Sequence, residues 1–197
     1  MEKILIATKN EGKAREYRQI FAPKGFTVVT LNDLPEKIEI EENGKTFIEN
    51  ATLKATALAE QTNVLTLADD SGLCVDALAG APGIYSARYA GDHDDQANKA
   101  KLLQELKDVQ GQARSAHFHC AIVVVKPDKT RLVVEGKVDG LILEEEHGTG
   151  GFGYDPLFYY PELGRSFAEL SMEEKNKVSH RGRAVAMLLE KFDEWWD

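Results

Sequence analysis

Hydrophobic residues along the chain form short β-branched runs that alternate with stretches of helical period. Residues 3–8 and 27–31 are short apolar runs rich in branched side chains, which indicates strands. Between them the apolar positions recur at helical spacings, at Tyr17, Ile20 and Phe21. Pro23 and Gly25 follow, and both residue types end helices. The first part of the chain therefore predicts a strand, a loop, a helix and a second strand.

A second helix is expected to begin at Thr46. Thr46 and Glu49 have the spacing of a capping box, in which each side chain accepts a hydrogen bond from the other residue's backbone N–H. The apolar face of this helix consists of Ile48, Ala51, Ala55 and Leu58, and Asn50 and Lys54 lie on another face. Residues 64–72 predict a buried strand that ends at two aspartates and a glycine turn. A Gly- and Pro-rich stretch over 80–95 then leads to a polar helix over 96–107.

The pattern changes in the second half of the chain, where the helical period is lost. Residues 118–126 and 131–143, separated by the turn-forming sequence PDKT, predict a long antiparallel hairpin. Ser171 and Glu174 repeat the capping-box spacing. A last helix is marked by the apolar residues Val185, Leu188, Leu189, Phe192 and Trp195. Strands that are linked by helices in one part and paired as a hairpin in another predict an α/β fold with a mixed sheet.

Composition narrows the class of protein. The chain has 197 residues, with 24 Lys and Arg against 33 Asp and Glu, and 43% of its residues are hydrophobic. These proportions are ordinary for a globular protein, and we expect a single domain over residues 1–197. The net charge of −9 argues against a protein that holds long nucleic acid, because phosphate contacts need a basic surface. A small polyanion can still bind to a local basic pocket together with a divalent metal.

The sequence predicts neither export nor a membrane anchor. The apolar run of residues 4–7 is much shorter than the apolar region of a signal peptide. No run approaches the ~20 apolar residues of a membrane-spanning helix. Cys74 and Cys120 lie far apart and have no metal-binding or redox spacing, as expected for thiols in a reducing compartment. We therefore expect a cytoplasmic protein without a membrane segment.

The loop directly after the first strand is the first candidate for chemistry. It consists of Thr8, Lys9, Asn10, Glu11, Gly12 and Lys13. A Gly-containing loop that opens a helix presents free backbone N–H groups and the positive end of the helix dipole, to which Lys13 adds a full charge. This arrangement suits a phosphate, although Ala7 and Ala14 stand where a Walker loop has its first glycine and its Ser or Thr. The alternative is a plain turn with a solvated lysine.

Acidic residues form the second candidate. The apolar strand ends at Asp69, Asp70 and Ser71. Adjacent acids are costly there when buried, unless a metal, a basic partner or solvent compensates them. Because side chains alternate along a strand, only one aspartate is expected to point into a given pocket. Upstream lie further carboxylates that suit magnesium, those of Glu39, Glu41 and Glu42. The alternatives are a polar turn and a solvated edge.

Cations and an aromatic loop complete the set of candidates. Ser179 is placed to cap the last helix, which puts His180 and Arg181 in its first turn. Cations oppose the helix dipole there, so an anionic ligand explains them better than local helix physics does, and simple exposure is the alternative. A stacking ring, close backbone approach and an acceptor for a nucleotide base are offered by Phe152, Gly153, Tyr154 and Asp155; a tight turn with a core aromatic is the alternative. Together these are the parts of a nucleotide hydrolase that acts through Mg²⁺.

Five blocks of the sequence carry a resemblance to a known family. They are ATKNEGK, TFIENATLKA, ADDSGLCVDALAGAPGIYSARYAG, GTGGFGYDPLF and EEKNKVSHRG, in this order and over nearly the whole chain. They are similar to the Ham1-like nucleoside triphosphate pyrophosphatases, also called inosine triphosphate pyrophosphatases, and most similar to the bacterial members. The resemblance implies Mg²⁺-dependent hydrolysis of ITP, dITP and XTP to the monophosphate and pyrophosphate, which cleanses the nucleotide pool. It also implies an elongated mixed sheet with flanking helices, two lobes around a central cleft, and a homodimer.

The resemblance assigns roles to individual residues. Residues 8–13 resemble the triphosphate-binding element of the family. Asp70 resembles the catalytic acid that binds magnesium and orients or deprotonates the attacking water, with Ser71 beside it on the substrate and Asp69 supporting the same metal network. Glu41 resembles the second metal ligand, and the choice among Glu39, Glu41 and Glu42 stays open. Groups that read the base and the phosphates on the other side of the cleft are Phe152, Gly153, Tyr154, Asp155, Lys175, His180 and Arg181.

Two other functions remain open at this stage. One is a Maf-like pyrophosphatase that acts on other modified nucleotides, and poor discrimination between ITP and dTTP or UTP would favour it. The other is a nucleotide-binding sensor without turnover. A sensor does not need adjacent aspartates, so the intact pair Asp69 and Asp70 argues against it.

Overall fold

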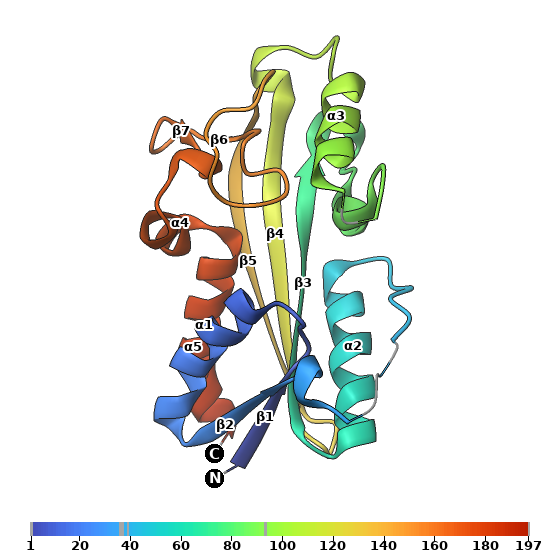
Figure 1. Cartoon of the computed structure of the whole chain (residues 1–197), viewed down its shortest axis with the longest axis vertical. Helices are drawn as coiled ribbons and strands as arrows, with labels where there is room; N and C mark the ends of the chain where they lie inside the picture. The colour runs from blue at the N-terminus through green and yellow to red at the C-terminus, as the bar shows by residue number, and fades with distance from the viewer. Residues whose placement is uncertain (1, 36–37, 39, 93, 197) are drawn as a thin grey trace. The chain divides into compact units, whose positions relative to one another are not determined.

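A mixed sheet is the framework of the computed structural model, which describes residues 2–35, 38, 40–92 and 94–196. In these residues seven strands have the order β2-β1-β3-β4-β5-β6-β7. The strands are β1 (Glu2–Ile6), β2 (Phe26–Thr30), β3 (Leu65–Val75), β4 (Ser115–Val125), β5 (Arg131–Ile142), β6 (Phe158–Tyr160) and β7 (Arg165–Ser166). The α-helices are α1 (Glu11–Phe21), α2 (Phe47–Thr62), α3 (Asp95–Glu105), α4 (Met172–Val178) and α5 (His180–Trp196) (Figure 1). The predicted α/β fold with a mixed sheet is confirmed. Within the described residues, none of these helices has the length and apolar character that crossing a membrane requires.

The strand pairing explains the connections along the chain. β1 runs parallel to both β2 and β3, with Ile4 opposite Val28 on one side and Leu65 on the other. Parallel neighbours need crossover connections, and α1 and α2 lie in these connections. β6 is antiparallel to β5 and to β7. β4 and β5 are neighbours joined by a turn over residues 126–130, which confirms the predicted hairpin.

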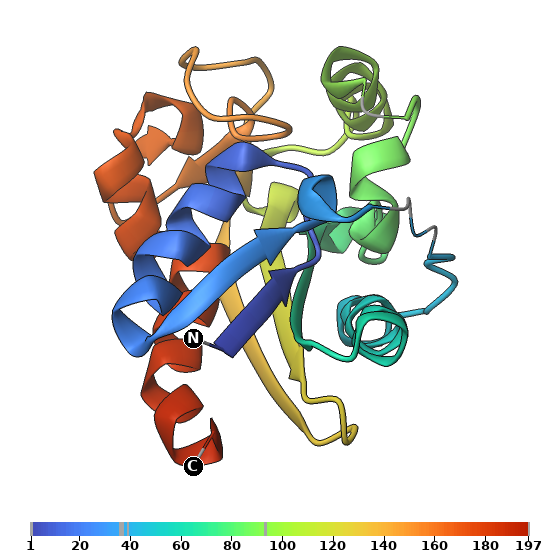
Figure 2. The ribbon, with the colours of Figure 1, turned by 60° about the horizontal axis from the view of Figure 1, so that its bottom comes forward.

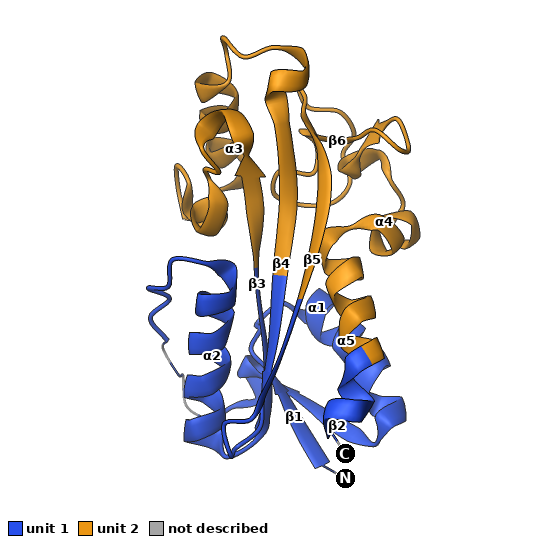
Figure 3. Ribbon diagram, turned by 180° about the vertical axis from the view of Figure 1, so that it is seen from behind, with its two compact units in different colours: residues 1–70, 121–134, 191–197 blue, residues 71–120, 135–190 orange. Residues whose placement is uncertain are grey.

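The chain divides into two compact units (Figure 3). Unit 1 consists of residues 1–70, 121–134 and 191–197, and unit 2 consists of residues 71–120 and 135–190. β3, β4, β5 and α5 each contribute residues to both units. That the whole chain acts as one domain stays a prediction.

Unit 1 is held together by small residues on one helix and by aromatic rings elsewhere. α2 contributes Ala51, Ala55, Leu58 and Ala59 to a core cluster with Leu5, Ala68 and Val123 of the strands. Phe21, at the end of α1, packs edge-on against Phe26 and Phe192 with ring centroids 6.1 and 5.1 Å away. Figure 2 shows α1, β2 and the C-terminal end of α5 near one another. This packing fixes α1 and its N-terminal loop on the parallel strands.

The two predicted capping boxes differ in the structure. Thr46 caps α2, because its hydroxyl accepts from Glu49 N at 3.1 Å. The Glu49 carboxylate accepts from Lys45 N at 2.6 Å, so the predicted reciprocal bond to Thr46 is wrong and the donor next to the cap is satisfied instead. The box between Ser171 and Glu174 is complete, with distances of 3.2 and 2.8 Å, and it starts the short helix α4.

Unit 2 has an aromatic core. Phe118 of β4 lies 4.6 Å from Phe158 and 5.9 Å from Phe167, measured between ring centroids. The same buried cluster includes Leu102 of α3 and Tyr154 of the glycine-rich loop. α3 and this loop therefore share one core.

The strand that holds the two aspartates does not end where the sequence predicts. β3 continues through Asp69, Asp70, Ser71 and Gly72 to Val75. The pairing of β1 with β3 ends at Leu67, whereas β4 remains a neighbour of β3. Pairing with a strand from a distant part of the sequence overrides the turn preference of Asp, Ser and Gly. The aspartates thus lie within a strand rather than in a turn.

Candidate active site

The loop between β1 and α1 is organised by its own side chains. Asn10 caps α1, and its Oδ1 accepts from Gly12 N at 2.8 Å and from Lys13 N at 3.1 Å. The buried Thr8 accepts from Asn10 N at 3.1 Å through Oγ1. The expectation of free backbone donors is therefore wrong for Asn10, Gly12 and Lys13, because an asparagine cap and a threonine already satisfy these N–H groups.

The side chains of this loop differ in their partners. Lys9 is exposed, and Glu11 is exposed and ion-paired with Arg18 at 3.1 Å. Lys13 instead donates to Asp69 Oδ2 at 2.8 Å, and the two side chains are 23% and 3% exposed. The ammonium of Lys13 is the positive group of the loop that lies beside the aspartates.

Asp69 and Asp70 have different surroundings, as the alternation of side chains along β3 predicts. The carboxylate of Asp69 is buried against Lys13. A buried carboxylate needs a charge partner, and Lys13 is such a partner for Asp69; a role of Asp69 in the metal network stays a prediction. Ser71 follows as a half-buried residue of the same strand.

Asp70 is half-buried and its acidity is altered. Burial raises the pKa of Asp70 to about 6; the nearby Lys54 and a hydrogen bond with Asn50 act in the opposite direction, and the carboxylates of Glu42 and Asp69 raise the pKa further. A carboxyl group with a pKa near the working pH is suited to general base catalysis. The surroundings of Asp70 therefore agree with the role that the sequence predicts for it.

Lys54 is a neighbour of Asp70 that the sequence did not indicate as a site residue. It lies on α2, its Nζ is 3.2 Å from Glu42 Oε1, and it donates to the backbone oxygen of Asp69 at 3.3 Å. The side chain of Lys54 is 15% exposed. One signal in the sequence could have indicated Lys54. It lies four residues after Asn50, off the apolar face of α2, and residues at this spacing share a helix face.

The acidic run contributes Glu42 to the group around Asp70, which consists of Lys13, Glu42, Lys54, Asp69 and Asp70. Glu42 pairs with Lys54 and acts on the titration of Asp70. Glu41 is exposed, and its role as metal ligand stays a prediction with Glu42 as the alternative. Glu39 lies outside the described residues.

The charges of this group suit a divalent cation. Asp69, Asp70 and Glu42 supply three carboxylates, and Lys13 and Lys54 supply two ammonium groups. Mg²⁺ in proteins is usually bound by one or two carboxylates together with waters and substrate phosphates. Asp70 and Glu42 fit such a donor set. In the part of the chain that the structure describes, no three His, Cys, Asp or Glu side chains are arranged to hold a metal by themselves.

The glycine-rich loop of unit 2 is folded around Asp155. This residue is 2% exposed, and its Oδ2 accepts from Phe152 N at 2.9 Å and pairs with Lys175 of α4. A Cβ on Gly151 would lie 2.1 Å from the same oxygen, so only glycine fits there. Asp155 is thus a buried acceptor that shapes the loop.

The two aromatic residues of this loop, Phe152 and Tyr154, differ in their exposure to solvent. The ring of Phe152 is 66% exposed, and Lys175 Nζ lies 4.5 Å from its centroid. Tyr154 is 5% exposed and its hydroxyl donates to Ser86 O at 2.8 Å. Phe152 is therefore available for stacking, whereas a direct contact of Tyr154 with a substrate stays a prediction.

Ser179 caps α5 as predicted. Its Oγ accepts from Gly182 N at 3.1 Å, and His180 and Arg181 occupy the first turn of the helix. The His180 ring stacks on Phe118 at 4.7 Å with an angle of 15° between the planes. The helix start lies close to β5, since a Cβ on Gly136 would lie 2.1 Å from His180 O. Strand, cap and ring together fix the positions of His180 and Arg181.

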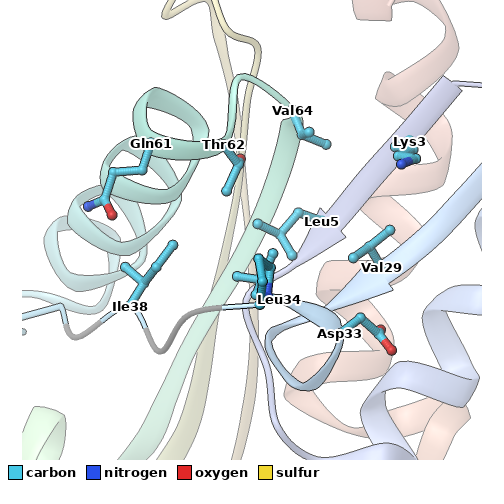
Figure 4. A pocket seen from close by; sticks show the side chains of 10 residues that line it. Lys3, Leu5, Val29, Asp33, Leu34, Ile38, Gln61, Thr62 and Val64 are labelled. Atoms are coloured by element: carbon cyan, nitrogen blue, oxygen red, sulfur yellow. The ribbon is translucent and has the colours of Figure 1, made fainter.

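A cavity of about 460 Å³ in unit 1 lies apart from these groups (Figure 4). Its lining includes Leu5, Val29, Leu34, Ile38 and Val64, with Lys3, Asp33 and Gln61 as polar members. None of the residues singled out by the sequence analysis lines it. The cavity has a largely apolar lining and shares no lining residue with Lys13, Asp69 or Asp70, so we do not include it in the candidate active site.

Comparison with known proteins places the chain in a family. The sequence model of the Ham1 family matches residues 4–191. The chain is 51% identical to the dITP/XTP pyrophosphatase of Bacillus anthracis, over 100% of this chain and 98% of the relative. It is 53% identical to the dITP/XTP pyrophosphatase of Lactiplantibacillus plantarum, over 98% of this chain and 96% of the relative.

Solved structures give the same result. The Ham1 protein of Staphylococcus aureus matches with a TM-score of 0.92 at 43% identity, covering 98% of this chain and 99% of that one. A HAM1 protein from Coxiella burnetii matches with a TM-score of 0.92 at 39% identity, covering 98% of this chain and 100% of that one. The resemblance of the five sequence blocks is confirmed, and the chain belongs to the Ham1 family.

Proposed function

We propose that this protein is a hydrolase that converts ITP, dITP and XTP to the nucleoside monophosphate and pyrophosphate with the help of Mg²⁺, and that residues 1–197 act as one domain. The relatives named dITP/XTP pyrophosphatase, which match nearly their whole length, support the reaction. The observation that carries the proposal is the setting of Asp70, a carboxyl group with a raised pKa beside Lys54 and Glu42.

The residues of unit 1 are suited to the triphosphate. A triphosphate carries several negative charges, which must be neutralised before water can approach phosphorus. The ammonium groups of Lys13 and Lys54 are both partly exposed and already held by carboxylates, so they are fixed in place before a substrate binds. We assign residues 8–13 and Ser71 to the phosphates, with Lys13 as the charged contact.

Asp70 is the residue that we assign to the chemical step. Its carboxylate takes the proton of the attacking water while the new P–O bond forms, the bridging P–O bond breaks, and pyrophosphate leaves. Asn50 and Lys54 hold the carboxylate in place through a hydrogen bond and a charge. Mg²⁺, held by Asp70 and either Glu41 or Glu42, would supply further neutralisation of phosphate charge.

We assign the reading of the base, and part of the phosphate contacts, to residues of unit 2. The exposed ring of Phe152 offers a stacking surface, and Lys175, His180 and Arg181 supply donors. Hypoxanthine and xanthine have a 6-keto acceptor where adenine has a 6-amino donor. A donor such as Arg181 would be satisfied by the keto group and left unpaired by adenine, which is a strong basis for discrimination. Guanine shares the keto group, so position 2 of the base must be read as well.

We also propose a cytoplasmic location and a homodimer. Cys74 is a free thiol, which agrees with a reducing compartment. The homodimer rests on the family resemblance alone, and sedimentation of the purified protein would test it.

Pyrophosphate release from a panel of nucleoside triphosphates tests the proposed activity. ITP, dITP and XTP should be hydrolysed much faster than ATP, GTP, dTTP and UTP when Mg²⁺ is present, and a chelator should abolish turnover. Equal rates for ITP and dTTP would instead support a Maf-like activity. Binding of ITP without any release of pyrophosphate would support a sensor.

A further inference from the structure

Asp95, the first residue of α3, is bonded to the predicted base-reading loop. Its Oδ2 accepts a hydrogen bond from the backbone N–H of Gly153 at 2.8 Å, from a position 58 residues earlier in the chain. Both residues belong to unit 2. We propose that Asp95 is a positioning residue that holds residues 152–155 in the conformation that binds the nucleotide base. The inference rests on the proposed function, because it assumes that this loop receives the base.

Successive backbone and side-chain bonds leave the loop little freedom. Phe152 N donates to Asp155 Oδ2 at 2.9 Å, Gly153 N donates to Asp95 at 2.8 Å, and the Tyr154 hydroxyl donates to Ser86 O at 2.8 Å. Gly153 has a φ of +59°, in the left-handed region, which turns the chain between the exposed Phe152 and the buried Tyr154. The bond from Asp95 therefore acts at the residue where the exposed ring leaves the core.

α3 is itself firmly attached by two buried side chains that follow Asp95. Asn98 is 2% exposed, and its Oδ1 accepts from Ala90 N at 2.6 Å and from Gly91 N at 3.2 Å. Lys99 is 5% exposed and pairs with Glu146, upstream of the glycine-rich loop, at 2.5 Å. A helix that is fixed in this way is a rigid support, and binding groups held by rigid elements keep their geometry better than groups held by loops alone.

Loss of the Asp95 carboxylate should weaken binding without changing the chemical step. The Gly153 N–H would lose a charge-assisted bond, and the loop would populate other conformations. The apparent affinity for a ligand falls by the fraction of molecules in the competent conformation. Asp95 is not among the residues that we assign to the phosphates or to the chemical step. The expected result is a raised KM for ITP with an unchanged kcat. This combination indicates the loss of an interaction that stabilises the bound substrate and the transition state equally.

Three variants test the proposal in the full-length protein. Asp95→Ala removes the acceptor. Asp95→Asn keeps an acceptor oxygen of nearly the same shape. Glu105→Ala is the matched control, because Glu105 lies at the other end of α3 and its carboxylate accepts from the Tyr89 hydroxyl rather than from a backbone N–H of the loop. Thermal unfolding of all three shows how much stability each change removes.

The measurements are KM and kcat for ITP, and inhibition by IMP and by inorganic tripolyphosphate. Asp95→Ala should raise KM for ITP and the inhibition constant of IMP by about 5- to 20-fold, and should leave kcat and inhibition by tripolyphosphate within twofold. Asp95→Asn and Glu105→Ala should resemble the parent in these constants. A purely structural role would lower kcat through a smaller folded fraction and leave KM unchanged.

Several results would overturn the inference. These are a parental KM in Asp95→Ala, an equal loss of affinity for tripolyphosphate, an Asp95→Asn variant as impaired as Asp95→Ala, or the same rise of KM in Glu105→Ala. Failure of the proposed function would show in the parent protein, which would then not hydrolyse ITP. Failure of the positioning role shows only in the comparison of variants with an active parent.

Discussion

The ammonium group of Lys13 lies 2.8 Å from the carboxylate of Asp69, whose side chain is only 3% exposed. Lys13 therefore has two tasks that can be separated. It compensates a buried negative charge on β3, and we assign it to the phosphates of the substrate. Removal of one partner of a buried ion pair is costly because the other charge is left in the protein interior.

Lys13→Ala should lower the free energy of unfolding by about 3 kcal/mol, because the carboxylate of Asp69 loses its partner. Adding Asp69→Asn should recover most of this stability, since the unpaired charge is removed. Substrate affinity should not recover in the double variant, and KM for ITP and for GTP should rise by similar factors, because the lysine contacts phosphates that both share. Urea unfolding and steady-state kinetics measure the two effects. A change confined to ITP would contradict the assignment of Lys13 to the phosphates.

Asp70→Asn should reduce turnover of ITP by at least ~10²-fold, because the base and a metal ligand are lost together. Its effect on stability should depend on pH. The pKa of Asp70 is raised to about 6 by burial, so the ionised form destabilises the fold. This cost is absent below the unfolded pKa of about 3.8 and fully present above about 6.

In a chelating buffer at pH 7.5, Asp70→Asn should therefore be more stable than the parent, by on the order of 2 kcal/mol and a few degrees in Tm. Near pH 4 the two proteins should unfold at the same temperature. Thermal scans at both pH values check this, and the rate assay is its partner measurement. A variant that turns over ITP within threefold of the parent would show that Asp70 is not the catalytic base.

Local sequence signals were sufficient for much of the fold. The cap of α2 at Thr46, the cap of α5 at Ser179 and the hairpin of β4 and β5 all follow from patterns within a few residues. The continuation of β3 through Asp70 could not be predicted in this way. Asp, Ser and Gly favour turns locally, and the pairing that keeps them extended comes from β4, far along the chain.

The contacts within the candidate site could not be predicted either, because they join residues that are distant in the sequence. Types of residue that suit phosphate and metal were visible in the sequence, but their partners were not. The Lys13 to Asp69 pair joins residues 56 positions apart, and the Asp95 to Gly153 bond spans 58 positions. The prediction of free backbone N–H groups in the first loop failed for a local reason. The side chain of Asn10 caps α1 and accepts from the backbone N–H of Gly12, so this donor is not free.

Lys126 fastens the C-terminal end of α5 in unit 1. Its Nζ donates to the backbone oxygens of Trp195 and Trp196 at 3.1 Å each, and it lies 4.5 and 4.9 Å from the centroids of their rings. Lys126→Met should lower the free energy of unfolding by about 1–2 kcal/mol, because helix-end carbonyls lose a charged donor and two cation–π contacts disappear.

Kinetic constants for ITP should be unchanged in Lys126→Met, since the residue is not among those assigned to the substrate. Lys129→Met is the matched control: this lysine pairs with Glu60 but is 70% exposed, so its loss should have no measurable effect on Tm. Thermal unfolding of the two variants compares them directly. Equal melting temperatures in both would show that Lys126 does not anchor the helix end.

Gly136 sets the distance between β5 and the start of α5. A Cβ at this position would lie 2.1 Å from His180 O and 2.5 Å from Ala184 N, so Gly136→Ala forces the strand and the helix apart. We expect a loss of roughly 3 kcal/mol or more in stability together with a higher KM for ITP, because His180 and Arg181 move with the helix start. At Gly164 the nearest non-neighbouring atom of the described residues to an added Cβ is the Tyr159 hydroxyl, at 3.8 Å. Gly164→Ala should therefore cost about 1 kcal/mol from its φ of +63° and leave KM unchanged.

Arg181 tests how the base is read. It lies in the first turn of α5, where a cation opposes the helix dipole and an acceptor on a ligand would account for its charge. If Arg181 donates to the 6-keto group, Arg181→Ala removes a charge-assisted hydrogen bond worth roughly 1.5–3 kcal/mol, and kcat/KM for ITP should fall about 10- to 150-fold. ATP has no keto acceptor at this position and should lose much less, so the ratio of kcat/KM for ITP over ATP should approach one. An arginine that contacts only phosphate would lower both values by the same factor. Measured at one fixed concentration of Mg²⁺ and salt in parent and variant, an unchanged ratio would assign Arg181 to the phosphates instead of the base.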